Sequence, residues 1–163
     1  MIMIVAADEK WGIGINGDLL MPLPEDMMFF REKTKDSVII MGRKTLLSFP
    51  DGKPLKNRIN IVITGDKNFV EDGCVVCHSV EEAAQISKNY KDKDVFVVGG
   101  GTVYRQMLKY CDTAYITKIC KTFNEADTFI DNLDTFGEWS VVDESELRQH
   151  NGVEFKFVTY KKH

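Results

Sequence analysis

Short apolar runs alternate with short helix-like segments along most of this chain, and this alternation constrains the fold more than any other feature. The runs that read as strands cover residues 1–7, 37–41, 59–64, 74–77, 95–98 and 113–119. The segments that read as helices cover residues 24–34, 43–49, 80–88 and 102–109. Parallel strands need crossover connections, which are usually helices. The sequence therefore predicts an α/β fold with a mostly parallel sheet covered on both faces.

The end of the chain differs from this pattern. Residues 139–142 and 155–160 read as two antiparallel strands, separated by a polar connection that contains Asn151-Gly152. Residues 8–23 are rich in glycine, follow no sustained period and read as one long loop, which in compact domains is commonly functional. With no repeat or linker, residues 1–163 are expected to form a single domain.

Composition narrows the class of protein. A formal net charge of −4 argues against a general nucleic-acid binder, and no apolar run is long enough to span a membrane. The first residues lack the basic lead and long apolar core of an export signal. We expect a cytoplasmic monomer with reduced cysteines that binds small molecules rather than nucleic acid or membrane.

A carboxyl group near the start of the first predicted helix is the leading catalytic candidate. Pro24 suits a first helical turn, and Glu25 and Asp26 complement the helix dipole there. Helical spacing places Asp26 beside Met27 and Phe30, and partial desolvation would raise the pKa of Asp26. Two interpretations remain at this point: Asp26 handles a proton near neutral pH, or it only stabilises the helix start.

Three strand ends carry residues suited to anions. Gly42 is followed by Arg43, Lys44 and Thr45, which begin a helix where cations would oppose the dipole unless an anion lay between them. A second junction runs from Gly99 through Gly100 and Gly101 to Thr102, and a third is Ile63-Thr64-Gly65. Ligands of open α/β sheets bind beyond the carboxyl ends of strands. A phosphate-bearing dinucleotide would reach two such junctions.

Two motif matches lack the context that they need. Residues 12–17 fit G-x-G-x-x-G, but they do not directly follow a strand, and Pro22 and Pro24 interrupt the helix that should come next. Residues 74–78 fit the haem-attachment pattern C-x-x-C-H, but they read as a strand with no export signal. Cys111 and Cys120 show no paired spacing with that pattern, so no metal site is expected.

Arg58, Tyr104 and Thr117 allow two interpretations each on local grounds. Arg58 precedes a strand and is either an ordinary surface cation or a bidentate clamp for a carboxylate. Tyr104 and Thr117 either pack on the sheet or face a ligand.

Taken together, these segments resemble the dihydrofolate reductase family along essentially the whole chain. The family pattern G-x-L-P-W-x-L-P-x-D corresponds to residues 17–26, which read GDLLMPLPED. Further matches lie at residues 5–7, 13–14, 40–45, 57–62, 98–104, 115–117 and 126–129. Each match is modest alone, but their order and spacing are specific.

The resemblance implies the family's mainly parallel, eight-stranded sheet with four helices, and NADPH-dependent reduction of 7,8-dihydrofolate to tetrahydrofolate. Asp26 would bind the pterin and favour protonation of N5 through water, with support from Thr117. Arg58 would hold the glutamate α-carboxylate. The resemblance further implies that the substrate is lined by Val5, Ala6, Met21, Met27, Phe30, Phe49 and Val98.

The resemblance also implies a cofactor site. Ala7, Ile13 and Gly14 would contact the nicotinamide side, Tyr104 would lie nearby, and residues 8–23 would form a mobile lid. The residues implied for the phosphates are Gly42, Arg43, Lys44, Thr45, Thr64, Gly99, Gly100, Gly101, Thr102 and Val103. A cis Gly99-Gly100 peptide is expected as well.

The sequence departs from the family pattern at three positions. Leu20 and Met21 replace its Pro and Trp, and a thioether cannot donate the hydrogen bond of an indole. Thr102 stands where many members carry a cation. Two alternatives are a pyrimidine reductase of riboflavin synthesis, which shares the fold and NADPH chemistry, and a pterin- or nucleotide-binding module without turnover.

Overall fold

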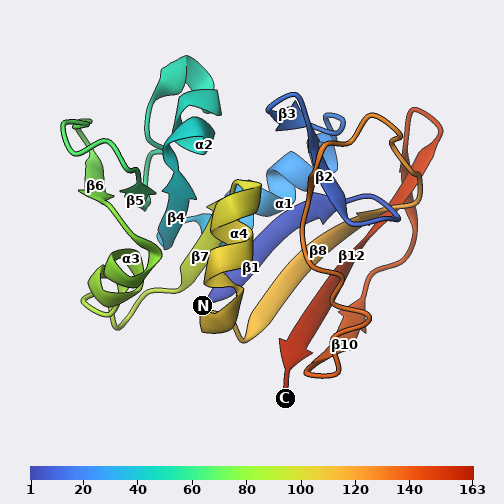
Figure 1. Ribbon diagram of the computed structural model, residues 1–163. Coiled ribbons are helices and arrows are strands. Elements are labelled where there is room, and N and C mark those ends of the chain that lie inside the picture. Colours follow the sequence, from blue (N-terminus) through green and yellow to red (C-terminus); the bar gives the residue numbers. More distant parts are fainter.

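One central sheet organises the computed structural model, which describes all 163 residues (Figure 1). Its strands are β1 (Ile2–Ala7), β4 (Val38–Gly42), β5 (Ile59–Ile63), β6 (Cys74–Cys77), β7 (Val95–Gly99), β8 (Thr113–Ile119), β10 (Trp139–Glu144), β11 (Arg148–His150) and β12 (Val153–Lys162). They lie in the order β10-β12-β8-β1-β7-β4-β5-β6, and β11 pairs with β12 as a ninth strand. Neighbours from β8 to β6 are parallel, whereas β12 is antiparallel to β8, β10 and β11. The predicted mainly parallel sheet with an antiparallel C-terminal edge is confirmed.

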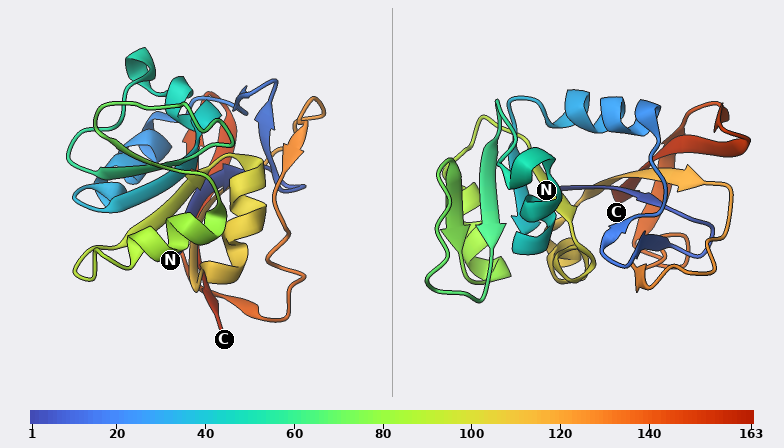
Figure 2. Two further views of the ribbon diagram at one scale, coloured as in Figure 1. Left: turned by 60° about the vertical axis from the view of Figure 1, so that its left-hand side comes forward. Right: turned by 90° about the horizontal axis from the view of Figure 1, so that it is seen from above.

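Helices cover both faces of this sheet (Figure 2). They are α1 (Pro24–Thr34), α2 (Arg43–Ser48), α3 (Val80–Ser87) and α4 (Gly101–Met107), with short 3-10 turns at Pro50–Gly52 and Leu108–Tyr110. Side chains of α3 and α4 pack into the larger apolar cluster, while α1 and α2 pack onto a second cluster that contains Ile39, Met41 and Leu46. Residues 38–41 of β4 are fully buried because both faces of the strand are covered. The four predicted helices are therefore confirmed.

The order of strands creates a place for a ligand. The chain passes from β1 to β4, and only later returns to insert β7 between these two strands. Their carboxyl ends, at Ala7, Gly42 and Gly99, consequently lie at one edge of the sheet. Clefts beyond the carboxyl ends of strands at such a reversal are the usual binding sites of open α/β sheets.

The sequence predicts one long irregular loop over residues 8–23. The structure shows a small hairpin within this range instead. Strands β2 (Gly12–Ile15) and β3 (Asp18–Leu19) pair with each other, and β2 also pairs with β9 (Thr128–Phe129). Asn16 and Gly17 form the turn with φ of 49° and 84°, as a two-residue hairpin turn requires. The Asn16-Gly17 dipeptide is a local signal for this hairpin that the sequence analysis did not use. The pairing of β2 with β9 has no local signal, because β9 lies far along the chain.

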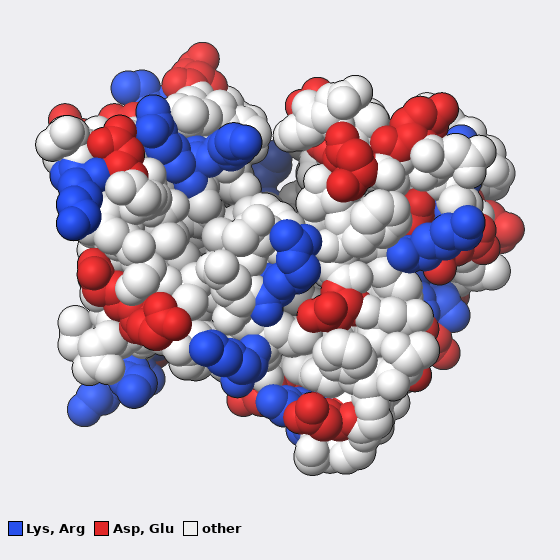
Figure 3. Space-filling model, in the orientation of Figure 1, with Lys and Arg blue, Asp and Glu red and all other residues white.

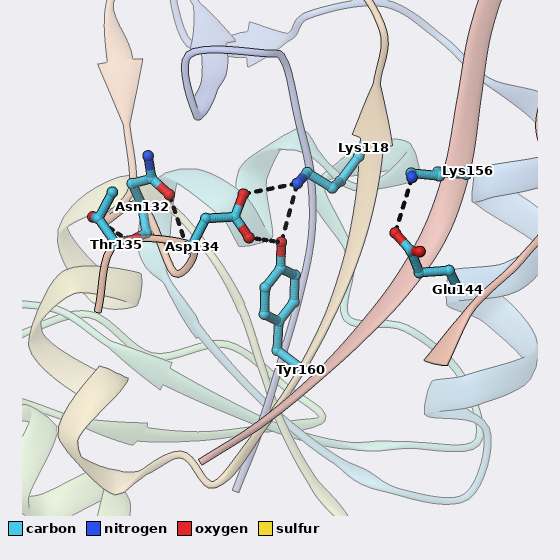
Figure 4. A network of polar contacts seen from close by, with 7 residues as sticks. All are labelled: Lys118, Asn132, Asp134, Thr135, Glu144, Lys156 and Tyr160. Carbon is cyan, nitrogen blue, oxygen red and sulfur yellow. Dashed lines mark hydrogen bonds and ion pairs between the residues drawn. The ribbon is translucent and has the colours of Figure 1, made fainter. Parts of the chain in front are cut away.

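A polar network supports the base of this hairpin (Figure 4). Lys118 Nζ donates to Asp134 at 2.9 Å and to the Tyr160 hydroxyl at 3.1 Å, and Tyr160 donates to Asp134 at 2.7 Å. The ring of buried Trp11 packs edge-on against Tyr160 and lies beneath the Lys118 ammonium group. The network thereby joins β8, β12 and the segment after β9 to the start of the hairpin.

The cysteines are free thiols. Cys74 and Cys77 bound β6, as predicted, and burial raises the pKa of the Cys77 thiol to about 11. A thiol with a raised pKa is a poor nucleophile and a poor metal ligand. None of the helices has the length and apolar character needed to cross a membrane.

Candidate active site

Asp26 lies in the first turn of α1 and meets Thr117 from the middle of the sheet. Pro24 begins the helix, so Asp26 stands at its third position and turns toward β8. Thr117, which is 2% exposed, donates its hydroxyl to Asp26 Oδ1 at 2.5 Å. Burial raises the pKa of Asp26, and the hydrogen bond from Thr117 opposes this rise. The structure thus brings together a partly desolvated carboxyl group and a fixed donor.

Apolar side chains lie on the same face of the sheet as Asp26. Phe30 and Phe49 pack against the cluster that contains Val98, which is 9% exposed. Met27, by contrast, is half exposed. These placements give the α1 side of the sheet an apolar wall, with Met27 exposed to solvent on α1.

The two β1 residues predicted to line the substrate, Val5 and Ala6, do not face the same side of the sheet. Ala6 packs with Leu20, Met21 and Leu23 on the α1 side, whereas Val5 and Ala7 pack into the cluster beneath α3 and α4. Successive side chains of a strand point to opposite faces, so three consecutive residues cannot all contribute side chains to one pocket. Val5 and Ala7 are therefore able to contribute only backbone on the α1 face.

Arg58 lies against the C-terminal end of α1. Its Nε donates to Thr34 Oγ1 at 3.0 Å, Nη2 donates to the Arg31 carbonyl at 2.8 Å, and Nη1 donates to the Lys56 carbonyl at 2.6 Å. Partial burial, followed by repulsion from Arg31, lowers the pKa of Arg58, which still leaves the guanidinium charged. The side chain is fixed by these three hydrogen bonds and forms no ion pair with an acidic residue.

The end of β4 carries two exposed cations with different surroundings. Arg43 forms an ion pair with Asp66 at 3.4 Å and lies 4.9 Å from the centroid of the Phe69 ring. Lys44 forms no ion pair. Thr64, at the end of β5, is 9% exposed and accepts a hydrogen bond from the Asp66 amide at 3.1 Å. Lys44 is thus the cation that remains free for an anion.

The glycines after β7 allow three segments to meet. The Gly99-Gly100 peptide is cis, as expected. A Cβ at Gly101 would lie 2.5 Å from Thr128 Cγ2 and 3.9 Å from Ile13 Cδ1, and a Cβ at Gly99 would lie 3.4 Å from Thr45 Oγ1. A side chain at Gly101 would therefore displace the β2–β9 segments, and the glycine run leaves room for close approach of a ligand.

Thr102, Val103 and Tyr104 begin α4. Val103 and Tyr104 are buried, and the Tyr104 hydroxyl donates to the Ile4 carbonyl at 2.7 Å. Thr102 is exposed and accepts a hydrogen bond from Arg105 Nη2 at 3.4 Å. Many family members carry a cation at the position of Thr102. Here Arg105, which the sequence analysis missed, places its guanidinium group beside the uncharged Thr102.

Two acidic residues that the sequence analysis missed hold the hairpin in place. Asp8 is 3% exposed and accepts hydrogen bonds from the amides of Gly12 at 2.8 Å and Phe123 at 2.9 Å. Asp127 accepts from the Asn16 amide at 2.9 Å, and its own amide donates to the Gly14 carbonyl. The position of Asp8 next to a glycine-rich stretch is a local signal that could have predicted its role. The role of Asp127 has no local signal, because its partners Gly14 and Asn16 lie far away in the sequence.

A hollow separates the α2 end of the molecule from the β2–β3 hairpin, and Figure 3 shows Lys and Arg side chains gathered on its α2 side. The fold and this arrangement are typical of a class of protein, the α/β enzymes that bind a dinucleotide beyond the carboxyl ends of their strands.

Comparison with known proteins identifies the family. The family model for dihydrofolate reductase matches residues 1–162. The chain is 39% identical to dihydrofolate reductase of Staphylococcus haemolyticus over 141 residues, covering 85% of this chain and 82% of the relative. It is 34% identical to the Bacillus subtilis enzyme, covering 98% and 92% respectively. A solved structure of Enterococcus faecalis dihydrofolate reductase, complexed with NADP(H) and RAB-propyl, matches with a TM-score of 0.85 and 33% identity, covering 99% of this chain and 95% of that one.

The chain belongs to the dihydrofolate reductase family. It is an NADPH-dependent oxidoreductase that reduces 7,8-dihydrofolate to tetrahydrofolate, the reaction on which one-carbon metabolism depends. The family assignment decides against the riboflavin-pathway reductase and the binding module that the sequence analysis left as alternatives.

Proposed function

We propose that Asp26 handles the proton in this reaction and that Thr117 positions it. The observation that carries the proposal is the hydrogen bond from buried Thr117 to a carboxyl group whose pKa burial has raised. Such a group accepts hydrogen bonds from the amino group and N3 of a pterin, and favours protonation of N5 through a water molecule. Reduction of the pterin double bond then needs one hydride and this one proton.

The apolar wall would bind the rest of the substrate. Phe30, Phe49 and Val98 contact the pterin and benzoyl rings, Ala6 and Met21 close the side next to the lid, and half-exposed Met27 is covered when substrate binds. Val5 contributes its backbone. Arg58 clamps the glutamate α-carboxylate, because its guanidinium is already fixed by three hydrogen bonds and loses little freedom on binding.

The residues at the strand ends fit NADPH. Backbone amides at Gly42 and Gly99–Thr102 suit a pyrophosphate, with Thr45 and Val103 beside them, and Lys44 with Thr64 and Arg43 suits the adenosine phosphate. Ala7, Ile13, Gly14 and Tyr104 surround the nicotinamide side. NADPH supplies the hydride, and the protein supplies orientation, the proton route and the exclusion of water.

Residues 8–23 would act as the lid over both rings. The hairpin is anchored at its base by Asp8 and at its tip by Asp127, and these contacts define the position in which it covers the site. Closure excludes water from the reacting atoms and brings the two rings to near-attack distance.

We further propose that the chain works as a cytoplasmic monomer without a nucleic-acid partner. Its net charge is −4, and its four cysteines are unpaired, as is usual in a reducing compartment. Light scattering of the purified protein tests the monomer: a mass near 18.6 kDa is expected, and twice that value would contradict it.

The central experiment follows the loss of NADPH absorbance when dihydrofolate is added, with NADH in parallel. Fast loss with NADPH and slow loss with NADH is expected. Lys44→Ala should raise the KM for NADPH roughly tenfold and leave NADH unaffected, because it removes a charge-assisted bond to the phosphate. Lys91→Ala, which removes an exposed cation after α3, is the matched control. Equal effects of Lys44→Ala on both cofactors would refute the phosphate assignment.

A further inference from the structure

A cavity lies beside the candidate active site. It has a volume of about 410 Å³ and opens between α1 and the C-terminal strands, lined by residues such as Phe29, Lys33, Tyr115, Asp143, Phe157 and Thr159. Neither Asp26 nor any residue proposed for the cofactor lines it. Tyr115 and Thr117 are two apart on β8, and Phe157 pairs with Thr117, so these residues share one face of the sheet, and Phe157 in the cavity wall lies next to the Asp26–Thr117 pair.

Aromatic rings form the floor of this cavity. Phe29 stacks on Phe157 with 4.4 Å between ring centroids, and Tyr115 meets Phe29 edge-on at 6.0 Å. Protein cations already stand over these rings. Lys33 Nζ lies 4.9 Å from the Tyr115 centroid, and the Arg148 guanidinium lies 5.4 Å from that of Phe157. The ring faces thus already bind positive groups of the protein, and a cationic ligand would take the place of Lys33, which forms no ion pair.

A β-bulge brings a carboxylate into the cavity wall. Val141 pairs with Tyr160, but Asp143 pairs with Thr159, so the register shifts at Val142. Without the extra residue Asp143 would share the face of Val141, whereas the bulge turns Asp143 to the face of Thr159 and Tyr115. Bulges commonly re-aim a side chain in this way next to functional sites.

The charges around the cavity favour a cation. Its lining holds Glu25, Glu32 and Asp143 against Lys33 and Arg148, so one negative charge is in excess. Arg148 is paired with Glu25 at 2.8 Å, which leaves Glu32 and Asp143 without an ion pair. We propose that this cavity is a binding site for a flat aromatic cation, which stacks on the floor rings and pairs with Asp143.

The probe for this site is benzamidine, a planar ring with a positive amidinium group. Neutral benzamide and anionic benzoate are the matched probes of similar shape. The protein is first saturated with NADP⁺ and an antifolate inhibitor, so that Asp26 is occupied and cannot bind the probe. Binding is followed by the backbone amide chemical shifts of Tyr115, Asp143 and Thr159.

Benzamidine should shift these amides saturably, with a dissociation constant on the order of 1 mM for so small a ligand. Benzamide should bind more weakly and benzoate not at all. Asp143→Asn should weaken benzamidine at least threefold, and Lys33→Met should strengthen it by a similar factor, because it removes a competing cation. Both positions are exposed, so neither variant threatens folding.

Glu144→Gln is the matched control, because it makes the same charge change one residue further along β10. Glu144 lies outside the cavity and pairs with Lys156 at 2.9 Å, as Figure 4 shows. The Glu144→Gln variant should leave benzamidine binding unchanged. Benzoate binding as tightly as benzamidine, equal effects of Asp143→Asn and Glu144→Gln, or the absence of saturable shifts would each overturn the proposal. Dihydrofolate turnover is measured in a separate experiment, so an absence of turnover would not be confused with any of these outcomes.

Discussion

Thr117 reaches Asp26 across 91 residues of sequence and donates to its carboxylate at 2.5 Å. Strand β8 fixes the donor in the middle of the sheet, and Pro24 fixes the acceptor by starting α1 two residues before it. Burial raises the pKa of Asp26 while Thr117 stabilises its charged form. The balance between these two opposing influences determines the pH at which Asp26 changes protonation.

Thr117→Val tests this balance with little change in shape. The pKa of Asp26 should rise further, because the hydrogen bond that lowers it is lost while burial remains. Turnover of dihydrofolate at neutral pH should fall about tenfold, the usual cost of a hydrogen bond to a charged group. A carbon NMR titration of the Asp26 carboxyl measures the shift, and Thr117→Ser should restore the original value. Titration at an unchanged pH in Thr117→Val would contradict the proposed support.

Asp26→Asn should change activity and stability in opposite directions. Turnover should fall about a hundredfold or more, because an amide cannot exchange the proton. Since burial raises the pKa of Asp26, protonation of Asp26 stabilises the folded protein. This stabilisation is fully present below the ordinary carboxyl pKa and is lost as the pH rises through the raised pKa.

At pH values above the raised pKa of Asp26, the Asp26→Asn variant should therefore unfold at a temperature a few degrees higher than the unmodified protein does. This difference should vanish in acid. Thermal unfolding at several pH values measures the effect. Asp92→Asn alters an exposed carboxylate instead and should change neither property. A pH-independent difference for Asp26→Asn would argue against a buried, titrating carboxyl group.

Local signals in the sequence determine some of these features and not others. Pro24, Glu25 and Asp26 predict the start of α1 because the chemistry of a helix start is local. Most strands of the central sheet are predictable because each contains a short apolar run. Strand β11 is not, because Arg148–His150 is polar and lies in the segment that the sequence predicts as a connection. Asp127 is different: its partner Asn16 lies 111 residues away, and neither residue carries a local sign of the contact.

Side-chain direction was also beyond the sequence analysis in two places. Val5 and Ala6 are neighbours in the family motif, but strand geometry sends their side chains to different faces of the sheet. The bulge at Val142 reverses which residues of β10 face α1, and an alternating pattern read from the sequence assumes that no residue is inserted. The bulge depends on the register with the partner strand, whereas the opposite directions of Val5 and Ala6 follow from strand geometry alone, and the fold decides which face α1 covers.

Met21→Trp tests the departure from the family pattern. Met21 is partly buried beside Ala6 and Leu23, and its flexible thioether cannot donate to water near the substrate. A tryptophan there should lower the KM for dihydrofolate several-fold, because it adds a donor and stiffens the pocket wall. Met21→Leu keeps the size without a donor and should leave the KM unchanged. Unchanged steady-state constants in Met21→Trp would refute a role for this position in substrate binding.

Asp127→Ala tests the anchor at the tip of the lid. The Asp127 carboxylate accepts from the Asn16 amide at 2.9 Å and from Thr128 Oγ1 at 3.0 Å, and these bonds, the first above all, lower the pKa of Asp127. Loss of the Asp127 carboxylate should speed hydrogen exchange of the Asn16 amide by about tenfold. It should also change turnover several-fold, because closure of the lid becomes less well defined. Glu125→Ala removes an exposed carboxylate from the same segment and is the matched control.

The pH dependence of this exchange gives a second, independent check. A carboxylate whose pKa is lowered in the folded protein contributes its stabilisation above the ordinary carboxyl pKa and loses it as pH falls through the lowered value. After correction for the intrinsic exchange rate, protection of the Asn16 amide in the unmodified protein should therefore decline in acid toward the level of Asp127→Ala. Protection that stays constant across this range, or that is equal in both proteins at neutral pH, would show that the lid is held by its backbone pairing with β9 alone.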